Sequence, residues 1–478
     1  MTQLKFVNRF NEMKILENSY LKKGSSLFIL YGRRRVGKTE LVNQFIRDRG
    51  IYFLATPEGD KENINDFKNS ISRFLNDDAF IGTTFTDWYS FFSILISNTS
   101  FQDKSKNSNI IIAIDEFPYL IESNKSIPSI FQKIYDTLIK NSNIMLILLG
   151  SSISIMENEV LSYKSPLYGR RSGQLQLKPL KFKYLNKFVD YDIDDLCKTY
   201  FVFGGIPEYL KKLNSHIGFW ENVLINILSK GAPLYEEADF LLRSEFRVPR
   251  NYMLILRSIS YGNHTMGDIC NYSGMDKSMI SKYLDILISL GIVTSEKPFG
   301  ASEKFKRRLY WISDQYTKFW FRYVLPHKSE IESSHIEEVY NNIKNDFSTF
   351  AGEQFENLVK ELILEGIMGR PFSNVSRWWG KNINKEKGKN IEEIDIVAYS
   401  EIKDELLFAE CKWTNKPVNV DLINELKTKS KILREQYPNK KYTYAIFSKS
   451  GFNNIMLDSS EDTNFIALSD IEKKLKEI

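Results

Sequence analysis

The sequence of 478 residues has few of the side chains that bind zinc or form disulfides, with three cysteines and four histidines. The cysteines lie far apart and lack C-x-x-C spacing, and the histidines form no pair with the spacing of metal ligands. These patterns exclude a zinc ribbon and a disulfide framework, and they favour a reducing compartment.

Long apolar runs and a signal-peptide pattern are also missing, so we expect a cytoplasmic protein that does not span a membrane. The 65 lysines and arginines nearly balance 60 aspartates and glutamates, which leaves a net charge of +5. Any nucleic-acid-binding site must therefore be a local basic patch. A chain of this length is too long for one hydrophobic core, so several domains are expected.

The most specific motif follows an apolar run and precedes an amphipathic segment. It fits the pattern G-x-x-x-x-G-K-[ST] between a strand and a helix, in which backbone N–H groups surround phosphate, Lys38 reaches the β and γ oxygens and Thr39 binds Mg²⁺. Its glycines permit the tight turn. The alternative is a glycine-containing turn with basic decoration. The predicted nucleotide-binding residues of this loop are Gly32, Arg33, Arg34, Arg35, Val36, Gly37, Lys38 and Thr39.

Two carboxylates end the continuous apolar run that starts at Ile110. Such a run is typical of a buried parallel strand, and ligands of open α/β sheets lie beyond the carboxyl ends of the strands. We therefore expect Asp115 to hold Mg²⁺, directly or through water, and Glu116 to polarise the attacking water. The alternative is a strand that ends in two exposed acids.

For other segments of the N-terminal half, the sequence predicts structure and a few possible contacts with the nucleotide. Residues 97–109 are polar and indicate an exposed loop. A further apolar strand ends at Gly150, so that the hydroxyl of Ser151 could contact the γ-phosphate. Arg170 lies on a loop before the next strand, where it could act as a charge sensor, as an arginine finger or as a solvated surface residue. Residues 180–240 are predicted to form a helical lid.

Five segments together resemble the archaeal-type ATPases, which are similar to AAA+ and signal-transducing (STAND) NTPases. The likeness covers about residues 5 to 235 and implies a P-loop NTPase fold that binds ATP. By this likeness Ser151 occupies the sensor position and Pro207 lies near the base. The segments that carry the likeness are Gly32–Thr39, Ile114–Pro118, Gly150–Ser152, Leu167–Arg170 and Gly204–Pro207.

From Val248 to Tyr310 the pattern changes to three short helices and a hairpin, which is the layout of a winged helix. Two roles stay open for this module: direct DNA binding, or rigid partnership with the nucleotide domain. In the third helix we expect Ile280, Leu284 and Leu287 to pack inward. The residues predicted to face DNA are Lys277, Ser278, Ser281 and Lys282 on this helix and Lys304, Lys306, Arg307 and Arg308 on the wing.

The C-terminal third begins with an amphipathic helix and continues as three strands, a helix and a strand. Asp395 is flanked by isoleucines, so period-two alternation turns its carboxylate alone toward one face of the sheet. Glu410 and Lys412 share a face of the next strand. A hairpin between these strands would place Asp395 beside Glu410, where two carboxylates can bind Mg²⁺ while Lys412 orients the attacking water and stabilises charge on phosphate. The alternative is a pair of strands joined by a salt bridge.

These residues resemble the PD-(D/E)xK nuclease core, with the motif Asp395…Glu410-Cys-Lys412, over about residues 348 to 450. The acid that this family carries on its helix corresponds to Glu356. The resemblance implies metal-dependent cleavage of nucleic acid by these four residues. The segment 381–390 is predicted to be a solvated loop. Its four lysines lie close enough together in the sequence to contact backbone phosphate.

We therefore predict a multidomain α/β protein with ATP and Mg²⁺ as cofactors. ATP binding and hydrolysis would control cleavage of nucleic acid, most of all DNA, and a homo-oligomer is compatible with this function. The alternative is an ATP-switched DNA-binding or protein-binding regulator whose nuclease-like domain is not catalytic, and a DNA-remodelling motor would require ring assembly. The predicted domains are a P-loop NTPase core with a parallel sheet (1–180), a helical lid (181–245), a winged helix and connector (246–326) and a restriction-endonuclease-like α/β domain of the PD-(D/E)xK type (327–478).

Overall fold

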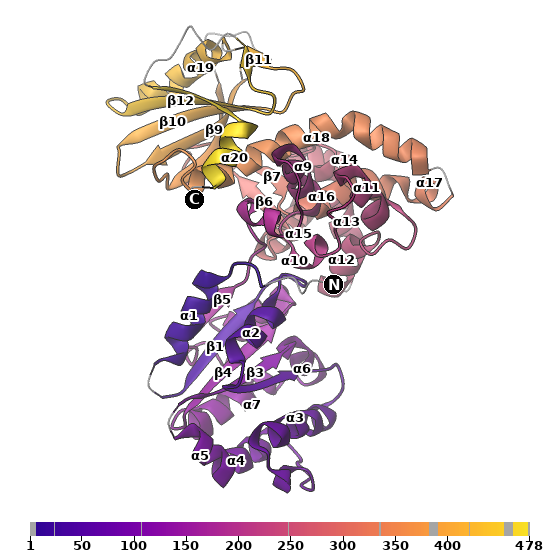
Figure 1. Cartoon of the computed structure of the whole chain (residues 1–478), viewed down its shortest axis with the longest axis vertical. Helices are drawn as coiled ribbons and strands as arrows, with labels where there is room; N and C mark the ends of the chain where they lie inside the picture. Colours follow the sequence, from indigo (N-terminus) through magenta and orange to yellow (C-terminus); the bar gives the residue numbers. More distant parts are fainter. Residues whose placement is uncertain are drawn as a thin grey trace. The chain divides into compact units, whose positions relative to one another are not determined.

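The structure is a computed structural model that describes residues 6–22, 24–106, 108–246, 248–333, 336–381, 391–419, 421–453 and 462–476. The chain forms two compact units (Figure 1). The first unit comprises Met1–Leu180, Ile206–Lys211 and Ser244–Arg247, and the second comprises Lys181–Gly205, Lys212–Arg243 and Val248–Ile478. The four-part division predicted from the sequence is finer and stays a prediction.

The first unit is built on a parallel sheet in the order β2-β3-β4-β1-β5. Every residue of β1, β3 and β4 is buried, as expected for parallel strands that are covered on both faces. The strands are β1 (Ser26–Tyr31), β2 (Gly50–Leu54), β3 (Ile110–Asp115), β4 (Ile144–Gly150) and β5 (Gly173–Gln176). The helices are α1 (Phe10–Tyr20), α2 (Lys38–Ile46), α3 (Asp60–Leu75), α4 (Trp88–Ser97), α5 (Thr99–Ser105), α6 (Phe117–Ser123), α7 (Ile127–Ile134), α8 (Ile153–Ile155) and α10 (Pro207–Leu210), with short 3₁₀ or π segments η1 (Asp78–Phe80), η2 (Tyr135–Ile139) and η3 (Met156–Leu161).

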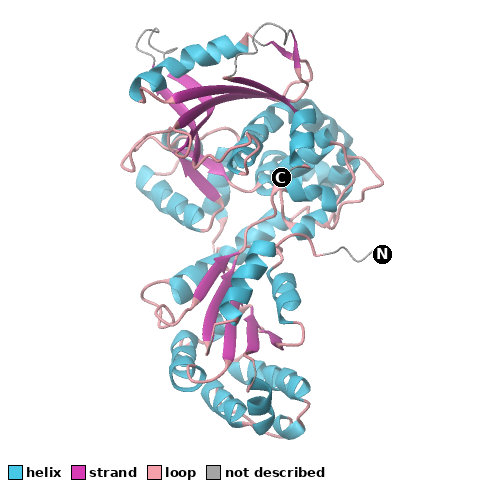
Figure 2. Cartoon of the chain, turned by 60° about the vertical axis from the view of Figure 1, so that its left-hand side comes forward, coloured by secondary structure: helices cyan, strands magenta, loops and turns pink. Residues whose placement is uncertain are grey.

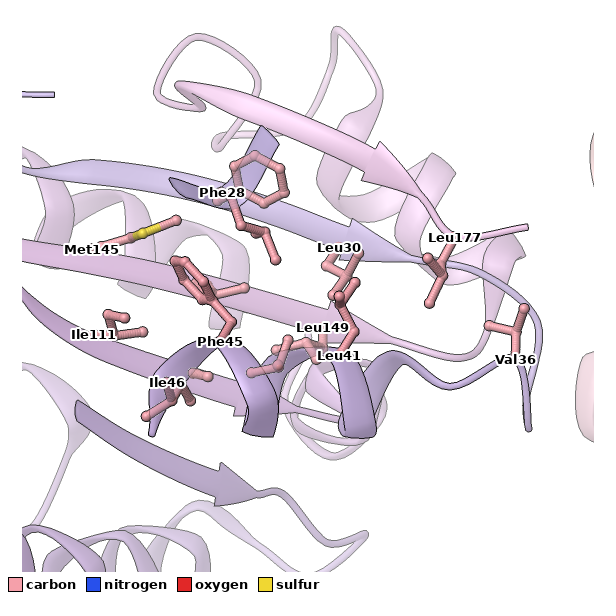
Figure 3. Close-up of a cluster of buried hydrophobic side chains, with 14 residues drawn as sticks. Phe28, Leu30, Val36, Leu41, Phe45, Ile46, Ile111, Met145, Leu149 and Leu177 are labelled. Atoms are coloured by element: carbon pink, nitrogen blue, oxygen red, sulfur yellow. The ribbon is translucent and has the colours of Figure 1, made fainter. Parts of the chain in front are cut away.

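One hydrophobic cluster joins the sheet to α2 (Figure 3). Phe28 and Leu30 on β1 pack with Leu41 and Phe45 on α2, and all four side chains are fully or almost fully buried. Burying a side chain of this size contributes about 1.5–3 kcal/mol. The cluster therefore fixes the strand before the phosphate loop and the helix after it, and it sets the path of the loop between them.

The predicted exposed loop over residues 97–109 is wrong, because α5 occupies Thr99–Ser105. The side-chain oxygen of Asn98 caps this helix by accepting a hydrogen bond from the backbone N–H of Phe101 at 2.9 Å. Phe101 is buried and anchors the helix to the unit. The polar composition concealed an ordinary N-cap signal, an asparagine one residue before a short helix.

The second unit begins with helices and contains the winged helix. Gly274, at φ +66°, ends α14 and leads into α15, which buries Ile280, Leu284 and Leu287 as predicted. The hairpin of β6 (Val293–Glu296) and β7 (Leu309–Ile312) follows, so the predicted winged-helix layout is confirmed. The helices are α9 (Ile193–Phe203), α11 (Phe219–Val223), α12 (Glu237–Glu245), α13 (Arg250–Ser260), α14 (Met266–Ser273), α15 (Lys277–Ser289), α16 (Gln315–Phe319), α17 (Lys328–Glu332), α18 (Ile336–Leu364), α19 (Leu422–Gln436) and α20 (Leu468–Leu475), with η4 (Phe182–Lys187), η5 (Leu224–Leu228), η6 (Trp320–Val324) and η7 (Leu325–His327).

The C-terminal part of the second unit contains a mixed sheet, drawn in magenta at the top of Figure 2. Its strand order is β14-β12-β10-β9-β8. Strands β8, β9 and β10 are antiparallel, whereas β10, β12 and β14 are parallel. Helix α19 packs on β9, β10 and β12, and α18 contacts β8, β9 and β10. The predicted order of helix, three strands, helix and strand is confirmed. The strands are β8 (Asn374–Lys381), β9 (Ile391–Ser400), β10 (Glu405–Lys412), β11 (Val418–Asn419), β12 (Lys441–Ser448), β13 (Phe452–Asn453) and β14 (Thr463–Ala467).

The wing, residues 293–312, packs against this sheet. Phe299 is 7% exposed and belongs to the same hydrophobic cluster as Trp378 and Ile394. Its backbone N–H donates to the carbonyl oxygen of Arg377 at 2.9 Å. The winged helix and the C-terminal sheet therefore share one core. Within the described ranges, no helix combines the length and apolar character needed to cross a bilayer.

Candidate functional sites

The phosphate loop joins β1 to α2 and is closed by its own lysine. Lys38 Nζ donates to the carbonyl oxygen of Gly32 at 2.7 Å and to that of Arg33 at 3.1 Å. Gly32 has φ +149°, and a Cβ there would lie 2.5 Å from the carbonyl oxygen of Leu177. Gly37 has φ +96°, a conformation that other residues rarely adopt. The two glycines are therefore required by the backbone itself.

Arg9, which lies before the first strand, holds the middle of the phosphate loop through a hydrogen bond. Val36 is buried, and its carbonyl oxygen accepts a hydrogen bond from Arg9 Nη2 at 3.0 Å. Arg35 takes a left-handed conformation with φ +67°. Arg9 also pairs with Glu12 at 3.0 Å. Sequence reasoning missed Arg9 because an arginine 27 positions before its partner gives no local signal.

The acids at the end of β3 accept hydrogen bonds from three hydroxyl-bearing side chains. Asp115 accepts hydrogen bonds from Thr39 Oγ1 at 2.7 Å and from Tyr52 OH at 2.8 Å. Glu116 has φ +51°, and its carboxylate accepts from Ser151 Oγ at 2.6 and 2.7 Å. The structure thus brings the predicted phosphate-loop, acid and sensor residues together. Tyr52, on β2, was missed because a tyrosine in an apolar strand does not mark a site.

The charge state of the loop lysine reflects its burial. Desolvation lowers the pKa of Lys38 to about 8, although the nearby Glu116 and Asp115 favour its charged form. Additional negative charge close to Nζ would therefore stabilise the ammonium group. Phosphate oxygens fit this requirement, and the hydroxyl of Thr39 together with the carboxylate of Asp115 offers the oxygen ligands that Mg²⁺ prefers. These residues fit a Mg²⁺–nucleotide.

Arg33 and Pro207 link the loop to α10 within the first unit. Arg33 Nη2 donates to Tyr209 OH at 3.1 Å. A Cβ placed on Gly37 would lie 4.0 Å from Pro207 Cγ, so the proline lies directly beside the loop. The predicted residue Pro207 is therefore part of the surroundings of the phosphate loop.

Arg34 and Arg170 have different partners. Arg34 Nη2 donates to Tyr119 OH at 3.1 Å, which places it beside α6 and next to the acids. Arg170 forms a salt bridge with Asp136 on η2, with a shortest distance of 2.9 Å. This salt bridge raises the pKa of Arg170. The structure does not join Arg170 to the loop residues described above, and its role as a sensor stays a prediction.

Glu245 is a further acid of the first unit that sequence reasoning missed. It is the last residue of α12 and lies in the segment 244–247. Its Oε2 accepts hydrogen bonds from Ser154 Oγ at 3.2 Å and from Ser152 Oγ at 3.4 Å. Burial raises the pKa of Glu245, and Arg34 partly offsets this effect. A glutamate about 90 residues after its partners carries no recognisable pattern.

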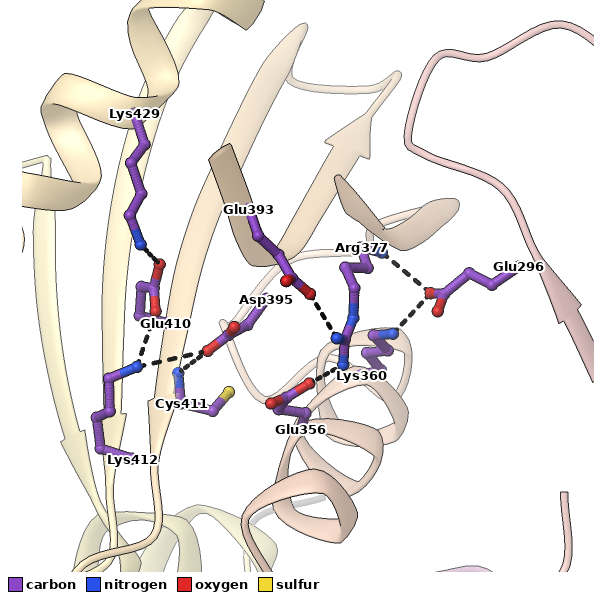
Figure 4. Close-up of polar contacts among 10 residues, drawn as sticks. All are labelled: Glu296, Glu356, Lys360, Arg377, Glu393, Asp395, Glu410, Cys411, Lys412 and Lys429. Carbon is purple, nitrogen blue, oxygen red and sulfur yellow. Dashed lines mark hydrogen bonds and ion pairs between the residues drawn. The ribbon is translucent and has the colours of Figure 1, made fainter. Parts of the chain in front are cut away.

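The C-terminal acids are brought together as the sequence predicts (Figure 4). Strands β9 and β10 pair in antiparallel register, with Ile396 opposite Ala409, and this places Asp395 beside Glu410. Asp395 accepts a hydrogen bond from the backbone N–H of Cys411 at 2.9 Å. Lys412 Nζ lies 2.9 Å from Glu410 and 3.9 Å from Asp395. Two acids and a lysine therefore converge on two neighbouring interior strands of the sheet.

A second lysine, Lys429 on α19, binds the other oxygen of Glu410 at 2.8 Å. Although burial acts to raise the pKa of Glu410, Lys412 and Lys429 together lower it below its ordinary value. For Asp395, burial and the charge of Glu410 raise the pKa. The two acids thus differ in proton affinity. Lys429 was missed because it is one of several lysines on an amphipathic helix.

Glu356 lies on α18 and pairs with Arg377 on β8 (Figure 4). Arg377 also binds Glu393 at 2.5 Å. Burial and the charge of Asp395 raise the pKa of Glu356, and Arg377 opposes the rise. The carboxyl group of Glu356 therefore interacts electrostatically with Asp395. Its direct partner, however, is Arg377. Sequence reasoning did not find Arg377.

The wing is connected to this group through Glu296. Its carboxylate accepts hydrogen bonds from Lys360 Nζ at 2.7 Å and from the backbone N–H of Arg377 at 3.1 Å (Figure 4). Lys360 lies one turn after Glu356 on α18. Contacts of the wing therefore reach both elements that carry the helix acid and its arginine.

The basic residues of the winged helix differ in availability. Lys277, Ser278 and Lys282 are exposed on α15, whereas Ser281 is half-buried. Lys304, Lys306 and Arg307 are exposed on the wing. Arg308 instead donates to Ser295 Oγ at 3.3 Å and to the carbonyl oxygen of Glu303 at 3.0 Å, so it holds the hairpin together. Of the predicted loop at 381–390, Lys381 is the exposed last residue of β8, and residues 382–390 lie outside the described residues.

A cleft of about 680 Å³ adjoins the acid site and is lined by Lys412, Asn415, Lys416 and Asn419 among others. Within the parts of the chain that the structure describes, no group of three or more His, Cys, Asp or Glu side chains is arranged to hold a metal ion. Asp395 and Glu410 fit Mg²⁺ as two carboxylate ligands, because Mg²⁺ in phosphate chemistry takes its other ligands from water and substrate.

Comparisons with known proteins agree with this architecture. A family model described as "ATPase domain predominantly from Archaea" matches residues 6–213, and this confirms the predicted archaeal-type ATPase. A model described as "Bacterial regulatory protein, arsR family" matches residues 253–295. A third, described as "Archaea bacterial proteins of unknown function", matches residues 320–430, which include all four candidate nuclease residues.

The chain is also similar to individual archaeal proteins. The uncharacterized protein MJECL04 of Methanocaldococcus jannaschii is 38% identical over 455 residues, which cover 93% of this chain and 95% of that protein. The uncharacterized ATP-binding protein MJ0423 of the same organism is 48% identical over 46 residues, or 10% of this chain and 78% of that protein. The solved structure of a Walker-type ATPase of Pyrococcus abyssi shares the fold, with a TM-score of 0.50 and 22% identity over 66% of this chain and 96% of that chain.

The match to MJECL04 extends over nearly the full length of both proteins, and the ATPase model covers the region that holds the phosphate loop and its acids. The chain therefore belongs to the protein family that includes MJECL04, and its N-terminal part is an archaeal-type P-loop ATPase domain.

Proposed function

We propose that ATP binding and hydrolysis by the first unit control metal-dependent cleavage of nucleic acid, most of all DNA, at the acid site of the second unit. The observation that carries this proposal is the position of Lys412 Nζ, 2.9 Å from Glu410 and 3.9 Å from Asp395. Adjacent carboxylates can hold a divalent cation and a lysine can stabilise charge on phosphate, and together these groups can promote phosphodiester hydrolysis. Lys412 lines a cleft of about 680 Å³, which would be the route by which a substrate reaches this site.

Each residue has a definite task in this reaction. Asp395 and Glu410 would hold Mg²⁺, which supplies Lewis-acid activation of water and of the scissile phosphate. Lys412 carries a positive charge next to both acids and would stabilise negative charge on the phosphate. Glu356, whose pKa is raised to about 8 by burial and by the charge of Asp395, is largely protonated near neutral pH and would act as a proton donor.

A non-catalytic regulator is the second candidate, and one observation favours it. Glu410 is already neutralised by Lys412 and Lys429, and Glu356 by Arg377. Acids that are fully paired can serve as structural salt bridges. In this case the ATP-switched chain would bind DNA or a protein without cutting a phosphodiester.

The winged helix would contribute to DNA binding through Lys277, Lys282, Lys306 and Arg307. Exposed cations on a recognition helix and on a wing can contact backbone phosphates. The match of residues 253–295 to a family of regulatory proteins supports this role. The shared core of wing and sheet would then present bound DNA to the acid site. The predicted domain boundaries at residues 180, 245 and 326 belong to this proposal.

The deciding experiment is a cleavage assay on the full chain with DNA and RNA substrates. Mg²⁺ or Mn²⁺ is supplied with ATP, ADP or no nucleotide. We expect the wild type to cut and the variants Asp395→Ala and Lys412→Ala to lose activity while they retain ATP binding. Glu401→Ala removes an exposed acid from a turn of the same sheet and serves as the matched control. Persistent cleavage in both site variants would refute the assignment.

The nucleotide dependence is tested in the same assay. Lys38→Ala should abolish ATP binding, and Glu116→Gln should retain binding but lose hydrolysis, because the glutamine cannot polarise water. Cleavage that is identical in both variants and in the wild type would separate the two units functionally. Wild-type protein that binds DNA but cuts nothing under any condition would favour the regulator. Sizing with and without ATP tests a homo-oligomer.

A further inference from the structure

Residues 244–247 are assigned to the first unit, although the residues on both sides of them belong to the second. The chain belongs to the second unit up to Arg243 and again from Val248, two residues before α13 begins at Arg250. The backbone therefore joins this segment to the start of the winged helix through only a few residues. The question is what holds the segment in the first unit.

Glu245 provides that attachment through hydrogen bonds to the turn after β4, whose first serine binds Glu116. Glu116 is bound by Ser151 Oγ at 2.6 Å, and Ser151 is followed directly by Ser152. Ser152 Oγ lies 3.1 Å from Ser154 Oγ, and both hydroxyls donate to Glu245 Oε2 at 3.4 and 3.2 Å. The turn after β4 thus touches Glu116 on one side and Glu245 on the other.

The charges around Glu245 are those of the phosphate site. Glu245 is close enough to Arg34 and Lys38 to interact with both charges electrostatically. Arg34 belongs to the phosphate loop, and Lys38 is the residue that contacts β and γ oxygens in this motif. A γ-phosphate would add negative charge to the same cations that Glu245 faces. Like charges near shared cations repel, and ADP lacks the group responsible.

We propose that Glu245 distinguishes ATP from ADP: the γ-phosphate competes with its carboxylate for Arg34 and Lys38, which releases residues 244–246 from the serines. Glu245 is a specificity-determining and positioning residue in this scheme, and it takes no part in bond cleavage. It makes the segment before α13 responsive to the nucleotide. This inference depends on ATP binding by the first unit and is independent of cleavage in the second.

The test uses the full chain with Mg²⁺ and either a non-hydrolysable ATP analogue or ADP. Glu245→Gln keeps the size and hydrogen-bonding capacity of the side chain but removes its charge. We expect the analogue to bind about three- to tenfold more tightly to this variant, with ADP affinity changed less than about twofold. Ser154→Ala retains the charge of Glu245 but removes one of the hydrogen bonds that hold it, so it should change the ratio of the two affinities in the same direction as Glu245→Gln and by a smaller factor.

Hydrogen exchange of the wild type provides a second measurement that does not depend on a variant. Backbone amides of residues 244–246 should exchange faster with the ATP analogue than with ADP, whereas amides of β1 should not differ. An unchanged affinity ratio in a folded Glu245→Gln protein would overturn the proposal. Equal exchange of the segment in both nucleotide states would overturn it as well.

Discussion

The charge state of Lys38 leads to a quantitative prediction for nucleotide binding. Burial lowers the pKa of Lys38 to about 8 in the protein alone, and phosphate oxygens next to Nζ would raise it on binding. Binding therefore takes up a proton at pH values above the pKa of the free protein. The affinity for nucleotide should be highest well below pH 8, where Lys38 is charged. It should fall as the pH rises through this value.

The magnitude follows from the fraction of protein that carries the charge. With a pKa of about 8, roughly ten elevenths of the Lys38 side chains are protonated at pH 7 and roughly one eleventh at pH 9. Between these values the affinity for a non-hydrolysable ATP analogue should fall about tenfold, which corresponds to about 1.4 kcal/mol.

Calorimetric titration in two buffers of different ionisation enthalpy measures both the affinity and the uptake of a proton. Lys38→Arg provides the control, because a guanidinium remains charged over this range and should remove the pH dependence even where affinity is reduced. A flat profile for the wild type between pH 7 and 9, or no proton uptake at pH 9, would refute the reasoning.

Three other predictions concern the second unit. Phe299→Ala should lower the free energy of unfolding by about 3 kcal/mol in urea denaturation, because it removes a buried ring from the shared core. Arg377→Gln leaves Glu356 without its partner, so the loss should approach about 3 kcal/mol as the pH rises above the Glu356 pKa of about 8 and should be smaller at pH 5, where the acid is protonated. Glu substitutions at Lys306 and Arg307 should weaken DNA binding and flatten its dependence on salt.

Matched variants separate these effects from general damage. Phe240 is 60% exposed, so Phe240→Ala should change the free energy of unfolding by less than about 0.5 kcal/mol. Lys61→Glu reverses an exposed charge in the first unit and should leave the salt dependence of DNA binding near that of the wild type. An Arg377→Gln loss that is equal at pH 5 and pH 8 would show that the ion pair with Glu356 is not its cause.

The sequence was sufficient where the chemistry is local or where the pattern fixes the register. The phosphate loop is one continuous motif, and the alternation around Asp395 together with a short hairpin places it next to Glu410. The predicted loop over 97–109 failed because a polar seven-residue helix with one buried phenylalanine gives almost no periodic signal.

Pairings between distant segments could not be predicted. Arg377 meets Glu356 across 21 positions, and Glu296 meets Lys360 across 64, with no spacing rule that relates either pair. Phe299 reads as an ordinary residue of a wing turn, and its place in a core was found in the three-dimensional arrangement alone. Such contacts depend on how modules pack, and a single sequence does not encode this in a pattern that can be read.

The position of Phe299 limits how this protein can be divided in the laboratory. A fragment that starts at residue 327 would contain every acid of the C-terminal site but would lack the ring that packs against Trp378 and Ile394. It would also leave Lys360 without Glu296. We expect such a fragment to aggregate. A fragment that starts near residue 248 would contain Phe299, which covers that apolar surface. An inactive fragment starting at 327 would thus be evidence about an exposed core, with no bearing on catalysis.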